Sequence, residues 1–215
     1  MSVLDRYVEG CASAHQTLLG LVDSIEPTSV REPSLLPNWS RAHVLSHIAR
    51  NAEGLRRFFV AAEDGLVGEQ YPGGRAKRDA DIDDGANRDF SVIVSEVRTS
   101  IWELEGAWAR ASAEVWASKG RLLTGAEVTL EESVFRRWRE VVVHTSDLGY
   151  AYTWANWPND YVRFELDRQL MAWRASQPMG VKDFPEHVRR LPDAKRLAWL
   201  LQRTSIEGVE PGPGI

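Results

Sequence analysis

Hydrophobic residues recur at intervals of three and four along four stretches of the chain, which is the period of an amphipathic α-helix with one buried face. The first stretch covers residues 4–25 and is expected to end before Pro27. The third covers residues 94–115 and is expected to end near Gly120. Both stretches predict long helices that need a partner for one apolar face.

The second stretch begins after Ser40, the predicted N-cap, and its apolar face runs over residues 44–58. His47 and Asn51 lie on this face among hydrophobic side chains. The face therefore places two polar groups toward the interior.

Thr129 and Glu132 predict a capping box at the start of the fourth helix, and Gly149 is its predicted stop. Four long amphipathic helices can bury their apolar faces against one another. The pattern therefore favours an all-α fold built on a four-helix bundle.

Two regions interrupt this pattern. Residues 64–89 are rich in glycine and charge, which predicts a long mobile loop. Beyond the bundle, helices are expected within residues 160–176 and 192–205, and the tail from residue 207 is expected to be frayed.

The chain has 215 residues, enough for a bundle over residues 1–150 and a short, mainly helical C-terminal segment over residues 151–215. Its formal net charge of -5 does not favour nucleic acid or an anionic membrane as a partner. A secretory leader and a membrane span of roughly 18 apolar residues are both missing from the pattern, so we expect a cytoplasmic protein. The oligomeric state is not encoded in any pattern of the sequence.

Cys11 is the only cysteine, so a metal site would have to use histidine and carboxylate ligands. Glu140 and His144 are four residues apart on one helical face, and His47 lies on the inner face of another helix. Two histidines and one carboxylate are a common ligand set for catalytic zinc or another divalent metal. Spacing alone is equally compatible with a chance Glu–His pair and a satisfied core histidine. His43, one turn before His47, is expected to contact the pocket or support a ligand.

Two segments carry a family resemblance: "LLPNWSRAHVLSHIARNAEGL", with the pattern WSxxHVxxHxxxN, and "RWREVVVHTSDLG", with the pattern RExxxHxxDLG. Together they resemble the paired motifs of the mycothiol-dependent maleylpyruvate isomerase family, within the DinB-like superfamily of metal-binding four-helix bundles. The resemblance covers roughly residues 1–150, and the two motifs in this order are more specific than either alone.

The resemblance implies that His47, Glu140 and His144 bind the metal, with zinc as the expected ion. It also implies that mycothiol, the small thiol of actinobacteria, is the cofactor. Asn51 would contact a ligand or satisfy polar groups of the bundle, and Asp147 would orient a ligand histidine or cap the helix.

The family also has an arginine near the C terminus that contacts substrate, and Arg203 in "LAWLLQRTS" resembles it. Two departures leave the substrate open: the family's isomerases have a small α/β domain where this chain reads mainly helical, and Thr204 stands where glycine is frequent.

The implied reaction is cis–trans isomerisation of maleylpyruvate to fumarylpyruvate. A metal-activated thiolate adds to the cis double bond, the new single bond rotates, and the thiolate leaves unchanged, while a cation such as Arg203 holds a carboxylate or the enolate charge. Two alternatives remain: a mycothiol S-transferase acting on an electrophile, which would consume thiol, and a non-enzymatic helical binding module, which would bind no metal.

Overall fold

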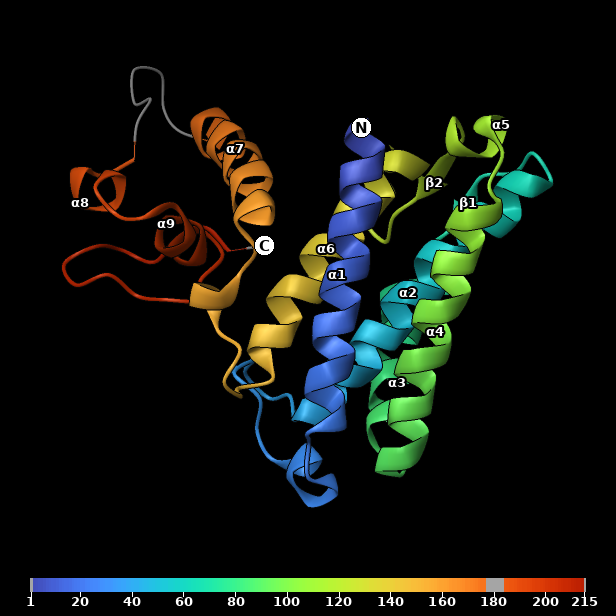
Figure 1. Ribbon diagram of the computed structural model, residues 1–215, viewed down its shortest axis with the longest axis horizontal. Coiled ribbons are helices and arrows are strands. Elements are labelled where there is room, and N and C mark those ends of the chain that lie inside the picture. Colours follow the sequence, from blue (N-terminus) through green and yellow to red (C-terminus); the bar gives the residue numbers. More distant parts are fainter. Residues whose placement is uncertain (1, 177–183, 215) are drawn as a thin grey trace. The chain divides into compact units, whose positions relative to one another are not determined.

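The structure is a computed structural model that describes residues 2–176 and 184–214. These residues are mostly helical, which confirms the predicted all-α fold with a four-helix bundle and a short, mainly helical C-terminal extension (Figure 1). The chain divides into two compact units, Met1–Gly149 and Tyr150–Ile215. No helix within the described ranges is long and apolar enough to cross a membrane.

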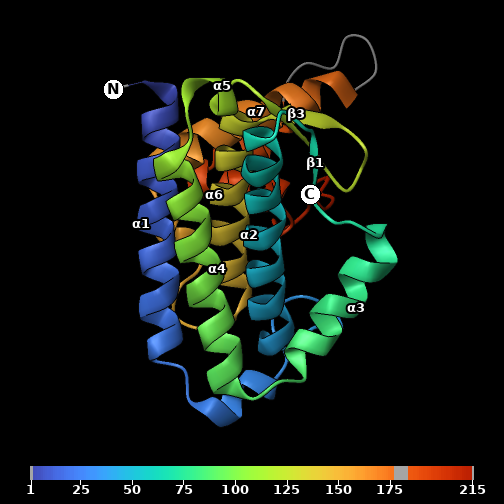
Figure 2. The same ribbon diagram turned by 90° about the vertical axis from the view of Figure 1, so that its right-hand side faces the viewer.

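The four predicted amphipathic stretches form the long helices of the first unit. They are α1 (Val3–Asp23), α2 (Arg41–Glu63), α4 (Phe90–Arg110) and α6 (Leu130–Asp147). α2 packs against α4 and α6, and α1 packs against the same two helices (Figure 2). The apolar face of each helix is buried in the bundle. Side chains on it such as Leu18, Ile48, Leu104 and Val141 have no exposed surface.

Predicted capping residues set three of the helix boundaries. Ser40 Oγ accepts a hydrogen bond from the His43 N–H at 3.4 Å, as the N-cap of α2. Thr129 Oγ1 accepts from the N–H three residues further on, at 3.1 Å, as the N-cap of α6. Gly149 has a φ of +74°, a left-handed conformation that stops α6. Between α1 and α2 the chain forms a 3₁₀-helix, η1 (Pro27–Arg31).

The prediction of a long loop over residues 64–89 is wrong. This segment contains strand β1 (Gly68–Glu69) and helix α3 (Gly74–Ala86), which packs against α2. α3 is polar along most of its length and buries only its C-terminal end, at Ile82, Gly85 and Ala86. Because so few of its positions are apolar, the helical period is absent from the sequence there.

The third predicted helix is shorter than expected, because α4 ends at Arg110 rather than near Gly120. The chain continues with α5 (Ala113–Trp116), β2 (Lys119–Arg121) and β3 (Glu127–Thr129). The sheet has the order β1-β2-β3, with β1 parallel and β3 antiparallel to β2.

Two paired glycines let this small sheet lie directly on α2. Gly68 and Gly120 are partners in the register of β1 and β2. A Cβ atom added at Gly68 would lie 2.6 Å from the Arg57 carbonyl oxygen, and one at Gly120 would lie 2.2 Å from the Phe58 ring. Only glycine fits at either position, so the β2–β3 turn is held close to the bundle.

The second unit contains η2 (Trp154–Asn156), α7 (Asn159–Ser176), α8 (Glu186–Arg189) and α9 (Asp193–Leu200). α7 packs against α9, and Trp173, Phe184 and Trp199 form an aromatic cluster between them.

The prediction of a frayed tail is wrong up to residue 214. Trp199 Nε1 donates to the Glu210 carbonyl at 2.9 Å, and Gln202 Nε2 donates to the Gly212 carbonyl at 2.6 Å. These bonds attach the tail to the end of α9. Ile215 lies outside the described residues.

Candidate metal centre

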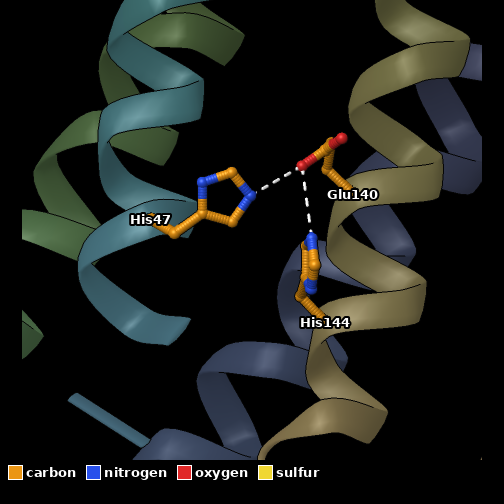
Figure 3. Close-up of side chains that lie close together, drawn as sticks. All are labelled: His47, Glu140 and His144. Atoms are coloured by element: carbon orange, nitrogen blue, oxygen red, sulfur yellow. Dashed lines mark hydrogen bonds and ion pairs between the residues drawn. The ribbon is translucent and has the colours of Figure 1, made fainter. Parts of the chain in front are cut away.

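Three side chains from two helices of the bundle converge on one point (Figure 3). His47 comes from α2, and Glu140 and His144 come from successive turns of α6. Glu140 Oε2 lies 2.9 Å from His47 Nε2 and 3.5 Å from His144 Nε2. The possible ligand atoms of all three residues lie within 4.8 Å of one another. The structure therefore brings together the three residues that the motifs imply as metal ligands.

The site is shielded from water but reachable through Glu140. The side chains of His47 and His144 are 6% and 11% exposed, whereas that of Glu140 is 27% exposed. Trp39 covers one side, with its ring centroid 5.5 Å from that of His47. A small molecule can therefore approach the carboxylate side without unfolding the bundle.

Burial and hydrogen bonding shift the pKa values of the three side chains differently, so their charges at neutral pH differ. Burial lowers the pKa of His47 to about 4, against the opposing hydrogen bond to Glu140. Burial also opposes charge on Glu140 and His144, but hydrogen bonds outweigh it. Those from the two histidines hold the pKa of Glu140 well below its usual value. Those to Asp147 and Glu140 raise the pKa of His144 to about 9.

Asp147 orients His144 from behind. Its Oδ2 lies 2.8 Å from His144 Nδ1, and the carboxylate is fully buried. Because Asp147 accepts the Nδ1 proton, His144 presents Nε2 to Glu140. A carboxylate behind a histidine is the usual support of a metal-ligating imidazole. This geometry matches the first of the two roles expected for Asp147.

The donor set fits a divalent first-row cation. Two imidazole nitrogens and one carboxylate oxygen converge, and this combination leaves at least one coordination position open in catalytic zinc sites. Among the described residues, this is the one group of histidine, cysteine and acidic side chains close enough to hold an ion together.

Metal binding at this site should release a proton. At pH 7 His47 is neutral, Glu140 is ionised and His144 is protonated, and coordination requires both imidazoles to be neutral. Because the pKa of His144 is about 9, raising the pH favours its metal-binding form. We expect zinc affinity to rise about tenfold per pH unit around neutrality, with about one proton released. Calorimetry in buffers of different ionisation enthalpy measures this number, and a value near zero would contradict the assigned charges.

Asp147→Asn should weaken zinc binding about 10- to 100-fold while leaving one zinc site. The amide has nearly the same shape but no charge, so it supports the His144 imidazole less strongly. Competition with a chelator of known affinity measures the change. Asp160→Asn, at an exposed aspartate of α7, is the matched control. An unchanged affinity in Asp147→Asn would show that the buried carboxylate does not act through His144.

A second layer of polar side chains lies one turn from the centre. Arg137, fully buried on α6, donates through Nη1 to Asn51 Oδ1 at 2.9 Å and to the Ile48 carbonyl at 2.8 Å. Its Nε donates to His15 Nε2 at 3.1 Å, and His15 Nδ1 contacts Glu105 at 2.8 Å. Asn51 therefore satisfies a polar group of the bundle, one of its two expected roles.

Sequence analysis did not single out Arg137. It stands in the run "FRRWRE", where arginine is ordinarily solvated. Its spacing from Glu140 and His144, three and seven residues, was the available signal, because these intervals place all three on one helical face.

His43 lies outside the three-residue cluster. Its Nδ1 accepts a hydrogen bond from the Ser40 N–H at 3.3 Å, and its ring stacks on Trp39 at 6.3 Å between centroids. Its Nε2 lies 3.6 Å from Asp83 on α3. The described contacts make His43 part of the α2 cap, and a contact with bound cofactor stays a prediction.

α3 supplies a residue that the sequence analysis missed, because the segment was expected to be a loop. Arg78 Nη2 donates to His47 Nδ1 at 3.2 Å, and its guanidinium lies 5.7 Å from the centroid of the Tyr71 ring. A cation thus lies beside the cluster.

Arg203, the predicted substrate contact, belongs to the second unit. It follows the left-handed residue Gln202, and its Nη1 donates to the Leu201 carbonyl at 2.6 Å. Its contact with substrate stays a prediction.

A four-helix bundle with two histidines and a glutamate converging from two of its helices defines a DinB-like bundle protein. The family model for the mycothiol maleylpyruvate isomerase N-terminal domain matches residues 11–149. The chain belongs to this family.

Two solved structures have similar folds: the mycothiol-dependent maleylpyruvate isomerase and a histidine-to-alanine mutant of it. Each has a TM-score of 0.76 and covers 81% of this chain and 72% of its own, at 23% and 22% sequence identity. At this identity the likeness establishes the fold. A search of curated proteins gives no match.

Proposed function

We propose that the protein is a mycothiol-dependent metalloenzyme that isomerises maleylpyruvate to fumarylpyruvate. The observation that carries this proposal is the convergence of His47, Glu140 and His144 within a bundle of the maleylpyruvate isomerase family. The fold alone would not support a particular activity, because proteins with unrelated activities share the helical-bundle fold.

In this proposal the three side chains hold a divalent cation, and zinc fits two imidazoles and a carboxylate. The bound cation would stabilise the thiolate form of mycothiol near neutral pH. Asp147 keeps the His144 imidazole in the tautomer that offers Nε2. Arg203 is the proposed cation for a substrate carboxylate or for the enolate charge.

Burial also contributes to the proposed chemistry. Trp39 and the bundle shield the histidines from bulk water, so charges at the site are weakly screened. The partly exposed Glu140 leaves an approach for thiol and electrophile. We place the reaction in the cytoplasm, where small thiols stay reduced.

The test measures the metal content of the protein and the amount of thiol consumed during turnover. Mass spectrometry of the purified protein should give one zinc per chain, and calorimetry should give metal-dependent binding of mycothiol. Maleylpyruvate should then be converted without any loss of mycothiol. Stoichiometric loss of thiol would instead identify an S-transferase. A protein that takes up no metal when zinc is supplied would be a non-enzymatic helical module.

A further inference from the structure

The two halves of α3 are held to the bundle in different ways. The C-terminal half is buried at Ile82, Gly85 and Ala86. A Cβ atom added at Gly85 would lie 2.2 Å from the Ser46 hydroxyl oxygen, so the helix touches α2 closely there. Arg31, from η1, donates hydrogen bonds to the carbonyl oxygens of Ala86 and of the second residue after it. This half of α3 is therefore anchored.

The N-terminal half of α3 contacts the bundle through one long side chain. Within residues 75–80 every side chain is exposed except that of Arg78, which is 16% exposed. Arg78 Nη2 donates to His47 Nδ1 at 3.2 Å, and the guanidinium lies 5.7 Å from the centroid of the Tyr71 ring. Figure 2 shows that α3 diverges from α2 toward its start. Arg78 thus connects this half of the helix directly to the metal cluster.

The backbone before this half is free to change direction. Gly73 and Gly74 have φ values of +89° and +74°, and glycine adopts either sign of φ without steric cost. Helices shorter than about 12–15 residues are marginal in water unless tertiary contacts support them. The first turns of the 13-residue α3 should therefore unwind once the Arg78 contact is lost.

The two histidines of the cluster have opposite partners at Nδ1. His144 faces the Asp147 carboxylate, which accepts the ring proton and leaves Nε2 free to bind a cation. His47 faces the Arg78 guanidinium, which can only donate, so its ring proton lies on Nε2, toward Glu140. A cation bound at Nε2 places that proton on Nδ1 instead, where two N–H donors would meet. The Arg78 contact and a metal at His47 therefore exclude each other.

We infer that α3 is a metal-dependent lid: metal binding at His47 releases Arg78, and the first turns of α3 then leave the bundle. The inference rests on the proposed function only in taking the cluster as a zinc site. The positive guanidinium also repels a dication, so charge and hydrogen bonding act in the same direction. Arg78 is a positioning residue in this inference, because it acts through the His47 imidazole.

The start of α3 borders space that is continuous with the cluster. A cavity of about 170 Å³ opens beside Glu140, between α2, α6 and the β2–β3 turn. A second cavity, of about 180 Å³, has Gly74 in its wall and shares Gln70 and residues 122–123 with the first. Each is smaller than the roughly 300–1,000 Å³ of pockets that enclose a drug-sized ligand. Release of the first turns of α3 would remove one wall of the second cavity and widen the approach to Glu140.

Zinc affinity tests the competition at His47, with a chelator of known affinity as the competitor. Arg78→Met removes the charge and the donor at similar length, so it should tighten zinc binding about tenfold. This sign is opposite to that expected for Asp147→Asn. Arg78→Lys keeps a cationic donor and should stay closer to the wild type. Arg75→Met, at an exposed arginine of the same helix, is the control for the lost charge and should change the affinity little.

Hydrogen exchange measured by mass spectrometry tests the lid itself. In the wild type, zinc should make the amides of residues 78–81, the first with hydrogen-bond partners inside α3, exchange at least about tenfold faster. The amides of residues 82–86 should not change, because that half stays anchored. In Arg78→Met, residues 78–81 should exchange fast with or without zinc.

Unchanged or weaker zinc binding in Arg78→Met would overturn the inference, and so would an equal gain in Arg75→Met. The exchange result separates the inference from the proposed function. Zinc-dependent release of α3 in a protein that converts no maleylpyruvate would keep the lid and reject the reaction. Conversion of maleylpyruvate by a zinc-loaded protein whose α3 exchanges as in the metal-free state would keep the reaction and reject the lid. A protein that takes up no zinc would reject both.

Discussion

His144→Ala should abolish stoichiometric zinc binding and, with it, mycothiol-dependent isomerisation. The change removes one of three converging ligand atoms and leaves the carboxylate of Asp147 buried without its imidazole partner. Loss of a group behind a ligand costs about 10- to 100-fold in affinity, so loss of the ligand itself should exceed that range. We therefore expect a zinc content close to zero after dialysis, compared with one per chain in the wild type.

His187→Ala is the matched control, because His187 is exposed on α8. Circular dichroism would show whether both variants keep their helices, so that loss of metal can be separated from loss of fold. Full zinc retention in His144→Ala would refute the ligand assignment. Retention of zinc together with loss of activity would place His144 in contact with substrate instead.

Arg137→Ala should lower the free energy of unfolding by about 2–5 kcal/mol, the range for replacing a large buried side chain by alanine. Arg137 is fully buried and donates to the Ile48 carbonyl, to Asn51 and to His15. Without its guanidinium, Asn51 Oδ1 and His15 Nε2 each lose a buried hydrogen-bond donor, and a large cavity remains. The expected loss is a major part of the ~5–15 kcal/mol that stabilises a typical domain.

Denaturant unfolding of the metal-free protein measures this loss without the added stability of bound zinc. Arg136→Ala is the control on the same helix: that side chain is 38% exposed, and its ion pair with Glu132 should be worth less than about 1 kcal/mol. If Arg137→Ala does not fold, Arg137→Lys, which keeps the charge but not the planar group, gives the intermediate value. A loss below about 1 kcal/mol in Arg137→Ala would show that the network relaxes around the missing group.

The long helices could be predicted because each buries one continuous face over five or more turns. α3 could not, since its burial is confined to Ile82, Gly85 and Ala86 at one end. The strands escaped prediction for a related reason: with two or three residues each, they are too short to show an alternating pattern. Their position depends instead on contacts with α2 that are remote in sequence.

Part of the candidate site could likewise be predicted from the sequence, and part could not. The spacing of Glu140 and His144 within one helix and the position of His47 on the inner face of another are visible in the sequence. The family resemblance then implies that the three form one ligand set. The position of Arg78 beside His47 and the cavity beside Glu140 depend on which segments lie beside α2 and α6. Such neighbours are set by tertiary packing, which the local pattern of either helix does not encode.

The small sheet lies close against α2, so substitutions at its two paired glycines and substitutions in its β2–β3 turn should have different effects. Any side chain at Gly68 or Gly120 would push the sheet away from the bundle and displace one wall of the cavity beside Glu140. The turn residues 122–124 project into that cavity from a backbone already fixed by the glycines. The lining of the cavity can therefore change, or be engineered, at three consecutive positions without altering the metal-binding side chains.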